Sequence, residues 1–466
     1  MLFNSLDFFI FLAVVLPLYF VLPVRGRQAL MVAASFYFYM YWNMKYSLIL
    51  VFFIFLDFSA GYYIGHAPTP AKKKIGLITS LTCNLGVLAL FKYYGFFAIN
   101  LQHLGIIDSV PTLGLLLPLG ISFHTFQTMS YTIDVYRGVI EPEVDLLRFA
   151  MFVSFFPQLV AGPIERAREL LPQIREKYPL AWENIVVGGR QMLDGFVKKV
   201  VLADNLAPWV NQVYGSPGNF SGGSCLVATY MFAWQIFFDF SGYSDIAIGI
   251  ARVMGFRFTQ NFNAPYISTT IQEFWRRWHI SLSSWLRDYL YISLGGNRRG
   301  EIRTYINLLL TMLLGGLWHG ASWNFVIWGG LHGSWLAMER LLTRSHKTIT
   351  EAIPGVFAQT VVRTLKCAAV FHGVCLTWVF FRARTLHDAM VLIRQISLWH
   401  SGDTFFHDFA WYKCLLTIWV GVVYFTLTRY VKKVPLMSLA WATATLGVLI
   451  IILLGAESQE FIYFVF

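Results

Sequence analysis

Two histidines are the side chains best suited to chemistry in this sequence. His319 lies in the motif Gly-Leu-Trp-His-Gly, inside residues 304–338, which are otherwise almost wholly apolar, aromatic or glycine. An ionisable side chain is expensive at membrane depth, so this position indicates a functional site. A neutral imidazole accepts the proton of an attacking hydroxyl at neutral pH, which makes His319 a candidate general base. The alternative is a histidine that only hydrogen-bonds to a neighbouring helix.

His279 is the second candidate, at the end of the run Phe-Trp-Arg-Arg-Trp-His. Its chemical roles would be to assist His319, to orient a thioester or to bind a carbonyl oxygen. The alternative is that it packs structurally on an interfacial helix. His124, His332 and His372 are interpreted as structural, and His332 should face away from His319 if one continuous helix carries both.

Composition indicates the kind of protein that must position these groups. The chain has 466 residues, 57% of them hydrophobic and 13% charged, against roughly 25% charged in a soluble domain. Many apolar runs approach the roughly 20 residues that a helix needs to cross a bilayer. We therefore expect an all-α polytopic membrane protein with about 11–13 membrane-embedded helices, re-entrant segments included, forming one integral-membrane domain over residues 1–466.

The net charge of +11 is explained by basic residues in short loops, which mark the cytoplasmic side of a membrane protein. On this basis Arg25, Arg27 and the lysines at residues 72–74 are expected to be cytoplasmic. No motif that reads nucleic acid is present, so no nucleic-acid partner is expected. The sequence also lacks a phosphate-binding loop, a dinucleotide fingerprint and a metal-spaced cluster, so neither a metal nor a tightly bound cofactor is predicted.

Local patterns predict the elements around the histidines. Residues 271–294 repeat apolar side chains every three to four positions, which predicts one amphipathic interfacial helix with His279 bordering its apolar face. Residues 149–161 are too short for a span and predict a re-entrant or interfacial segment, whereas residues 113–135 form a fifth apolar run. The glycine-rich residues 315–324 favour a turn deep in the membrane. Asp239 and Asp245 either cap a helix or make buried hydrogen bonds, or they line a polar cavity.

Several motifs together resemble one family. They are Phe-Trp-Arg-Arg-Trp-His-Ile-Ser-Leu-Ser at residues 274–283, Trp-Leu-Arg-Asp-Tyr at 285–289, Gly-Leu-Trp-His-Gly at 316–320, and Phe-Pro-Gln-Leu-Val-Ala-Gly-Pro at 156–163. The set is similar to the signature of membrane-bound O-acyltransferases (MBOAT), and most of all to the bacterial alginate O-acetyltransferase branch. The resemblance implies a ring of tilted helices around a central funnel. It also implies that His319 is the catalytic histidine and that His279 matches a second functional one.

The resemblance further implies a function. The expected protein is a multi-pass enzyme of the bacterial inner membrane, which takes acetyl groups from cytoplasmic acetyl-CoA and passes them to a periplasmic acetyltransferase partner. That partner would O-acetylate an exopolysaccharide, as in alginate biosynthesis. Arg276, Arg277 and Arg287 are candidates for binding coenzyme A phosphates, although cytoplasmic anchoring among membrane lipids explains them without a ligand. The acceptor stays open between alginate, cellulose, peptidoglycan and other glycans.

Two other classes of function remain open at this point. In a secondary transporter or flippase of a polar substrate, intramembrane histidines and acids would relay protons or bind that substrate. In a non-catalytic scaffold for polysaccharide export, His319 would be dispensable.

Overall fold

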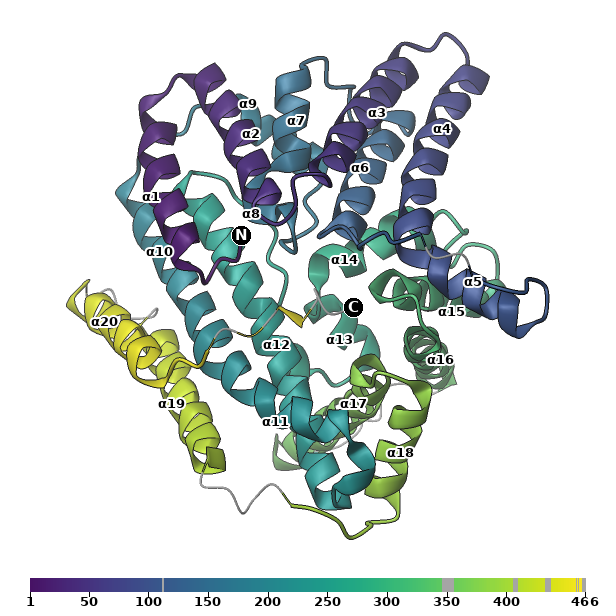
Figure 1. Ribbon diagram of the computed structural model, residues 1–466, viewed down its shortest axis with the longest axis vertical. Helices are drawn as coiled ribbons and strands as arrows, with labels where there is room; N and C mark the ends of the chain where they lie inside the picture. The colour runs from purple at the N-terminus through teal and green to yellow at the C-terminus, as the bar shows by residue number, and fades with distance from the viewer. Residues whose placement is uncertain are drawn as a thin grey trace. The chain divides into compact units, whose positions relative to one another are not determined.

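The computed structural model describes residues 1–110, 113–345, 356–404, 410–431, 437–457, 459 and 461–462. This part of the chain is helical and contains no strand, only an isolated bridge between Phe220 and Asp403 (Figure 1). It divides into two compact units, which are residues 1–192 with 246–259 and residues 193–245 with 260–466. The all-α prediction is confirmed, whereas the ring around a funnel and the single domain over residues 1–466 stay predictions.

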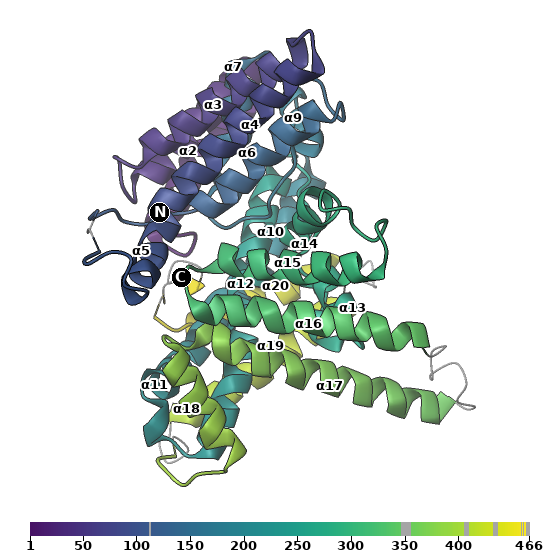
Figure 2. The ribbon, with the colours of Figure 1, turned by 90° about the vertical axis from the view of Figure 1, so that its right-hand side faces the viewer.

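The first unit is built on helices that share a buried polar network. In it, α3, α4 and α6 pack side by side (Figure 2). Asp57 on α3 accepts hydrogen bonds from Ser80 Oγ at 2.6 Å and Asn84 Nδ2 at 2.9 Å on α4, and Thr128 on α6 donates to Asn84. A buried carboxyl needs such partners, so the network specifies how these three helices align. The helices of this unit are α1 (Leu6–Val21), α2 (Val24–Met40), α3 (Ser47–His66), α4 (Pro70–Leu88), η1 (Ala89–Tyr93), α5 (Tyr94–His103), α6 (Ile121–Tyr136), α7 (Leu146–Ser154), α8 (Phe156–Leu159) and α9 (Ala167–Arg175).

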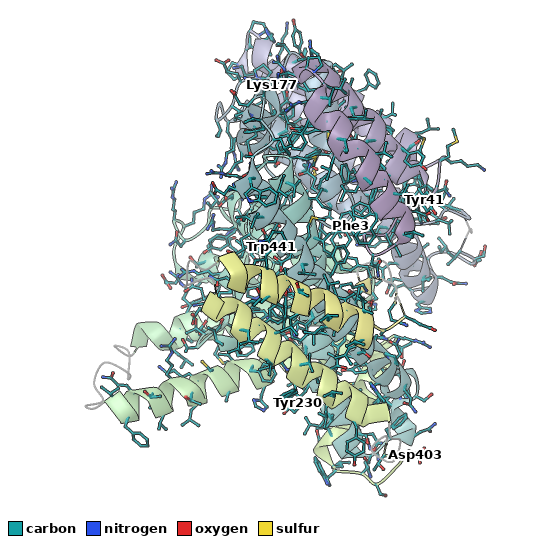
Figure 3. All side chains as sticks on the ribbon, turned by 90° about the vertical axis from the view of Figure 1, so that its left-hand side faces the viewer. Phe3, Tyr41, Lys177, Tyr230, Asp403 and Trp441 are labelled. Atoms are coloured by element: carbon teal, nitrogen blue, oxygen red, sulfur yellow. The ribbon has the colours of Figure 1, made fainter. Side chains whose placement is uncertain are left out.

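The second unit holds both candidate histidines. Two long helices, α10 (Trp182–Phe196) and α12 (Gly222–Val253), contribute residues to both units. Helices α19 and α20 lie side by side, as Figure 3 shows with Trp441 on α20, and both pack on η2. The remaining helices of this unit are η2 (Val197–Ala203), α11 (Asp204–Gly215), η3 (Pro217–Asn219), η4 (Pro265–Ile267), α13 (Ile271–Arg277), α14 (Ile280–Trp285), η5 (Leu286–Tyr291), α15 (Glu301–His319), α16 (Trp323–Ser345), α17 (Val356–Arg382), α18 (Leu386–Ser397), α19 (Ala410–Val431) and α20 (Met437–Leu454).

Three helical segments of the described chain are long and apolar enough to cross a membrane. They are Ser47–His66, the 34-residue Pro70–His103, and Val356–Arg382. Shorter apolar helices occur at Leu6–Val21, Leu415–Thr428 and Trp441–Leu454. The membrane-spanning class is thus confirmed, whereas the count of 11–13 embedded segments stays a prediction.

The predicted turn within residues 315–324 is confirmed, whereas its depth in the membrane stays a prediction. Helix α15 ends at His319, α16 begins at Trp323, and the two helices run side by side as a hairpin (Figure 2). Glycines make this close approach possible. A Cβ on Gly316 would lie 2.2 Å from the carbonyl oxygen of Phe325, and one on Gly329 would lie 2.3 Å from that of Met312. Small residues therefore set the hairpin spacing, as they do between many membrane helices.

The helix predicted over residues 271–294 is wrong as a single element. It breaks at Trp278 and His279, where His279 adopts a left-handed backbone with φ of 44°. Residues of the preceding segment supply the missing bonds, since Asn261 O accepts from Ile280 N at 2.9 Å and Asn261 Oδ1 accepts from Ser281 N at 3.2 Å. The apolar face is nevertheless buried as predicted, including Phe274 and Leu282.

Two other apolar runs also deviate from single helices. Within residues 113–135, α6 begins only at Ile121, because Gly120 has a positive φ of 72° and ends the preceding irregular segment. The run at residues 149–161 divides into α7 and α8 at Phe155, and Pro157 lies in the first turn of α8, where a proline is tolerated. Both short helices are buried within the first unit, and their re-entrant placement in a membrane stays a prediction.

The hairpin leads to a testable prediction. Gly316→Ala is expected to destabilise the protein by about 1–3 kcal/mol, because the new methyl group would overlap backbone atoms that cannot move independently. The matched control is Gly330→Ala, where a Cβ would meet only Leu313 Cδ2 at an ordinary 3.5 Å. Thermal unfolding in detergent should lower the midpoint for the first variant and leave the second unchanged or higher. Equal midpoints for both would show that the glycine contact does not set the spacing.

Candidate functional site

His319 lies at the end of α15, beside the turn of the α15–α16 hairpin. Its side chain is buried, with 5% of the residue exposed. Three aromatic rings meet it edge to face, with centroids 4.9 Å away for Trp318, 5.1 Å for Trp328 and 5.2 Å for Phe381. These rings form an aromatic wall around the imidazole, and a low local dielectric strengthens any polar interaction made with a bound ligand.

His279 is held in one orientation by Asn261. The residue is fully buried, and its Nδ1 lies 3.1 Å from Asn261 Oδ1. That amide oxygen also accepts from Ser281 N and Oγ, while Asn261 Nδ2 donates to Ser244 Oγ at 3.2 Å, so the orientation of the amide is defined. In a neutral ring, Nδ1 must then donate, and Nε2 carries the lone pair. Burial lowers the pKa of His279, which keeps the ring neutral.

The two candidate histidines belong to one aromatic cluster. The Trp318 indole contacts both, with ring centroids 6.1 Å from His279 and 4.9 Å from His319. His279 also meets Phe240 on α12 at 4.6 Å. The left-handed backbone of His279 is rare for a residue with a side chain and is typical of sites where a precise position is required. The structure therefore brings the two predicted catalytic residues together around one ring.

The expectation that His332 faces away from His319 is wrong. It assumed a continuous helix, but the chain reverses at the hairpin, so α16 returns past α15. His332 and His319 contact the same ring, Trp328, at 4.8 and 5.1 Å. His332 is fully buried, and its Nε2 lies 2.9 Å from Thr377 Oγ1 on α17. Its hydrogen bond to Thr377 agrees with the structural role predicted for it.

The other histidines singled out from the sequence lie elsewhere. A ring nitrogen of His124 hydrogen-bonds to the carbonyl oxygen of Leu159 in the first unit. His372 is exposed on α17 and bonds to the Ala368 carbonyl oxygen of its own helix at 2.7 Å. Neither contact involves the cluster around Trp318.

Two of the three predicted arginines line one cavity. Its volume is about 540 Å³, and Arg276 and Arg287 lie on its wall together with Arg340 and Trp275. Arg276 is exposed and makes no ion pair with a described residue, whereas Arg287 pairs with the adjacent Asp288 at 2.6 Å. Trp275 also contacts Trp328 and His332, so the cavity borders the aromatic cluster.

Arg277 differs from these two arginines. Its guanidinium pairs with Glu273 at 2.8 Å and donates to the carbonyl oxygen of Asn263. It does not line the cavity with Arg276 and Arg287. These bonds give Arg277 a structural role at the end of α13, so the structure separates it from the other two predicted arginines.

The acids of α12 make buried ion pairs. Lys199 Nζ lies 2.8 Å from both Asp204 Oδ1 and Asp239 Oδ1 and also donates to the carbonyl oxygen of Gln459. Asp239 accepts a further bond from the backbone N–H of Ile462 at 2.7 Å. Asp245 pairs with Lys198 at 2.5 Å. The buried hydrogen-bonding interpretation is confirmed for Asp239, whereas Asp245 and Lys198 form a partly exposed ion pair. No group of three potential metal ligands occurs within the described ranges.

Sequence reasoning missed several residues that shape the site. Asn261 hydrogen-bonds to His279, and Thr377 hydrogen-bonds to His332. Trp328 and Phe381 lie against the ring of His319. No local pattern marks them, because a single asparagine in a polar segment or an aromatic residue in an apolar run looks the same with or without a histidine beside it.

Comparisons with known proteins match these features. Residues 139–351, which include both histidines, match the family described as MBOAT, membrane-bound O-acyltransferase family. A probable alginate O-acetylase of Azotobacter vinelandii is 44% identical over 84% of this chain and 76% of its own length. A peptidoglycan O-acetyltransferase of Helicobacter pylori is 37% identical over 84% of this chain and 79% of its own. A teichoic acid D-alanyltransferase of Bacillus subtilis is 27% identical over 58% of this chain and 69% of its own.

Proposed function

The chain belongs to the membrane-bound O-acyltransferase family, and on that premise we propose that it transfers acetyl groups from acetyl-CoA with His319 as the general base. It is an O-acyltransferase and a multi-pass protein of the bacterial inner membrane. The observation that carries the proposal is the position of His319, a buried imidazole beside the turn of a glycine-packed hairpin and within three aromatic rings.

The proposed chemistry needs one base and an activated donor. The acceptor hydroxyl gives its proton to the His319 imidazole while its oxygen attacks the thioester carbonyl carbon. The carbon–sulfur bond then breaks, the oxygen ester forms, and the proton passes from the imidazolium to the thiolate of coenzyme A. General-base catalysis of this kind contributes about 10²–10⁴-fold to the rate. The thioester supplies the driving force, so no further cofactor is required.

His279 is proposed to act beside His319, across the Trp318 ring that contacts both. With Nδ1 held by Asn261, its Nε2 presents a lone pair, which suits a second proton acceptor better than a donor to a carbonyl oxygen. Arg276 and Arg287 on the cavity wall are proposed to attract the phosphates of coenzyme A. Arg277 is left out of this role because Glu273 already pairs with it.

The final acceptor is proposed to be a polysaccharide outside the cytoplasm. Two of the relatives are described as an alginate O-acetylase and a peptidoglycan O-acetyltransferase, so their acceptors are both glycans. A membrane enzyme with a cytoplasmic donor needs a second protein to place the acetyl group on a polymer outside the membrane. The proposed partner is a periplasmic acetyltransferase of the same modification system.

The test uses the full chain in proteoliposomes, with acetyl-CoA labelled in its acetyl group on the cytoplasmic side. Wild-type protein should release free coenzyme A thiol and pass label to an acceptor, and His319→Ala should do neither. If no label leaves the thioester and a polar solute crosses the membrane instead, the protein is a transporter. If polysaccharide acetylation in cells is unchanged by His319→Ala, the protein is a scaffold or uses another base, and the proposal fails.

The role of His279 is tested through its hydrogen-bond partner. Asn261→Ala removes the oxygen that accepts from His279 Nδ1 and Ser281 N, so the ring loses its fixed tautomer. The variant also loses the bond from Ser281 Oγ and the bond that Asn261 Nδ2 donates to Ser244 Oγ, and the loss of these four buried hydrogen bonds, about 1 kcal/mol each, is expected to lower kcat roughly tenfold or more. The matched control is Asn263→Ala, which is exposed and bonds through its backbone. Equal kcat values for both variants would remove Asn261 and His279 from the mechanism.

A further inference from the structure

The first unit contains a basic cavity, and none of its lining residues belongs to the candidate site described above. Its volume is about 750 Å³, and it is lined by α9, the start of α10, the last turn of α12 and the segment that follows it. Three guanidinium groups line it, those of Arg168, Arg252 and Arg257, against one carboxylate on its wall, Glu169. The cavity therefore has an excess of positive charge and suits an anionic ligand.

Two of the three arginines have capacity to bind a ligand. Arg252 Nε is buried and has no hydrogen-bond partner among the described residues. The carboxylate of Glu183 lies 3.5 Å from another nitrogen of Arg252, but it is 80% exposed, so water screens this pair. Arg257 is exposed and makes no ion pair with any residue that the structure describes. An anion in the cavity would accept from Arg252 Nε and would give Arg257 an ionic partner.

The wall of the cavity is fixed by hydrogen bonds. Gln173 on α9 accepts from Arg257 N at 2.7 Å and donates to Arg257 O at 3.1 Å, which holds Arg257 beside α9. Two residues further on, Thr259 N donates to the buried Glu165 at 2.7 Å. Gly255, with φ of 98°, lets Tyr178 pack where any Cβ would lie 2.5 Å from it. The arginines are thus presented by a defined frame, which lowers the entropy lost on binding.

The surface beside the cavity is apolar. Asn184 on α10 lines the cavity, and Val187, one turn later on the same helix, is 46% exposed. Leu180 and Trp182, which precede Asn184, are exposed as well. In a membrane protein, exposed valine, leucine and tryptophan beside arginines mark the boundary between acyl chains and headgroups. This combination suits a ligand that has both a phosphate and acyl chains.

We propose that this cavity binds the phosphate of an anionic phospholipid, with the headgroup on Arg252 and Arg257 and the acyl chains along the exposed face of α10. Guanidinium groups bind phosphate oxygens in pairs, so two adjacent arginines suit a phosphate group. A soluble compound that carries phosphate shares this chemistry but gains nothing from the apolar face. The proposal does not depend on acetyl transfer.

The test measures lipid binding to the full chain by native mass spectrometry, with titrations of phosphatidylglycerol and phosphatidylethanolamine. The wild-type protein should bind phosphatidylglycerol more tightly than phosphatidylethanolamine. Arg252→Gln with Arg257→Gln should weaken phosphatidylglycerol binding by about tenfold for each guanidinium removed. The control pair, Arg303→Gln with Arg394→Gln, makes the same change of charge at two exposed arginines and should bind as wild type does.

Further measurements decide whether the ligand is a lipid or a soluble phosphate compound. Arg252→Lys with Arg257→Lys keeps the charge but loses the paired geometry, so it should bind with intermediate affinity; thermal unfolding confirms that each variant is folded. Titration with inorganic phosphate and with coenzyme A tests the soluble source. If the glutamine variants lose coenzyme A binding but keep phosphatidylglycerol, the ligand is soluble and the lipid proposal is wrong. Equal phosphatidylglycerol binding by all variants would also overturn it.

Discussion

Replacement of His319 by alanine is expected to lower kcat for acetyl transfer by about 10²–10⁴-fold with little change in KM. The imidazole takes a proton only as the acceptor oxygen attacks, so its removal affects the transition state more than the bound ground state. The substitution leaves a space among Trp318, Trp328 and Phe381. The measurement is steady-state release of coenzyme A thiol by purified protein in lipid.

Two controls separate chemistry from folding. His372→Ala removes an exposed imidazole that bonds to its own helix, so its kcat should equal that of wild type. His319→Gln keeps a polar side chain of similar size but has no basic nitrogen, so it should be as inactive as alanine. A glutamine variant that retains more than a tenth of wild-type kcat would mean that His319 positions groups rather than accepting a proton.

Replacement of Lys199 by methionine is expected to destabilise the folded protein by about 3–5 kcal/mol. Lys199 is 7% exposed, and its ammonium group contacts Asp204, Asp239 and the carbonyl oxygen of Gln459. Methionine fills a similar volume but leaves two buried carboxyl groups without a counter-charge. Reversible unfolding in mixed detergent, followed by tryptophan fluorescence, measures the loss.

The matched control removes the charges as well as the lysine. Lys199→Met with Asp204→Asn and Asp239→Asn leaves no buried charge in the cluster, so it should recover a substantial part of the stability lost in the single variant. Asp239 also accepts from Ile462 N, and the asparagine amide oxygen can still accept that bond. If the single and triple variants unfold alike, the loss comes from packing and the electrostatic explanation is wrong.

The sequence predicted what depends on composition and short spacing. Apolar runs predicted an all-α membrane protein, and the glycines around His319 predicted a turn, since both follow from local properties. The break at His279 was missed because an intact apolar repeat looks identical whether or not Asn261 inserts its amide against Ser281. Lys199 offers a similar case, because it meets Gln459 only after the whole chain has folded. Such pairings leave no signal in a single sequence.

The same limit applies to the candidate site. His319 stands out in the sequence because it is a histidine in an apolar run. Arg276 and Arg287 stand out because they belong to the basic residues around His279. Their separation from Arg277 could not be predicted, since it depends on which guanidinium meets Glu273 across one turn of α13. The placement of His332 failed for a related reason, because the angular argument assumed a helix that the hairpin interrupts.

The glycine contacts of the α15–α16 hairpin also constrain how the protein works. Gly316 and Gly329 place backbone against backbone, with no flexible side chain between the helices to absorb a shift. Sliding or spreading α15 and α16 would break many close contacts at once. The position of His319 relative to α16 is therefore fixed. If His319 is the base, as proposed, donor and acceptor must be delivered to it at a fixed position. The parts that move should be sought among the segments that admit substrates and not in the hairpin itself.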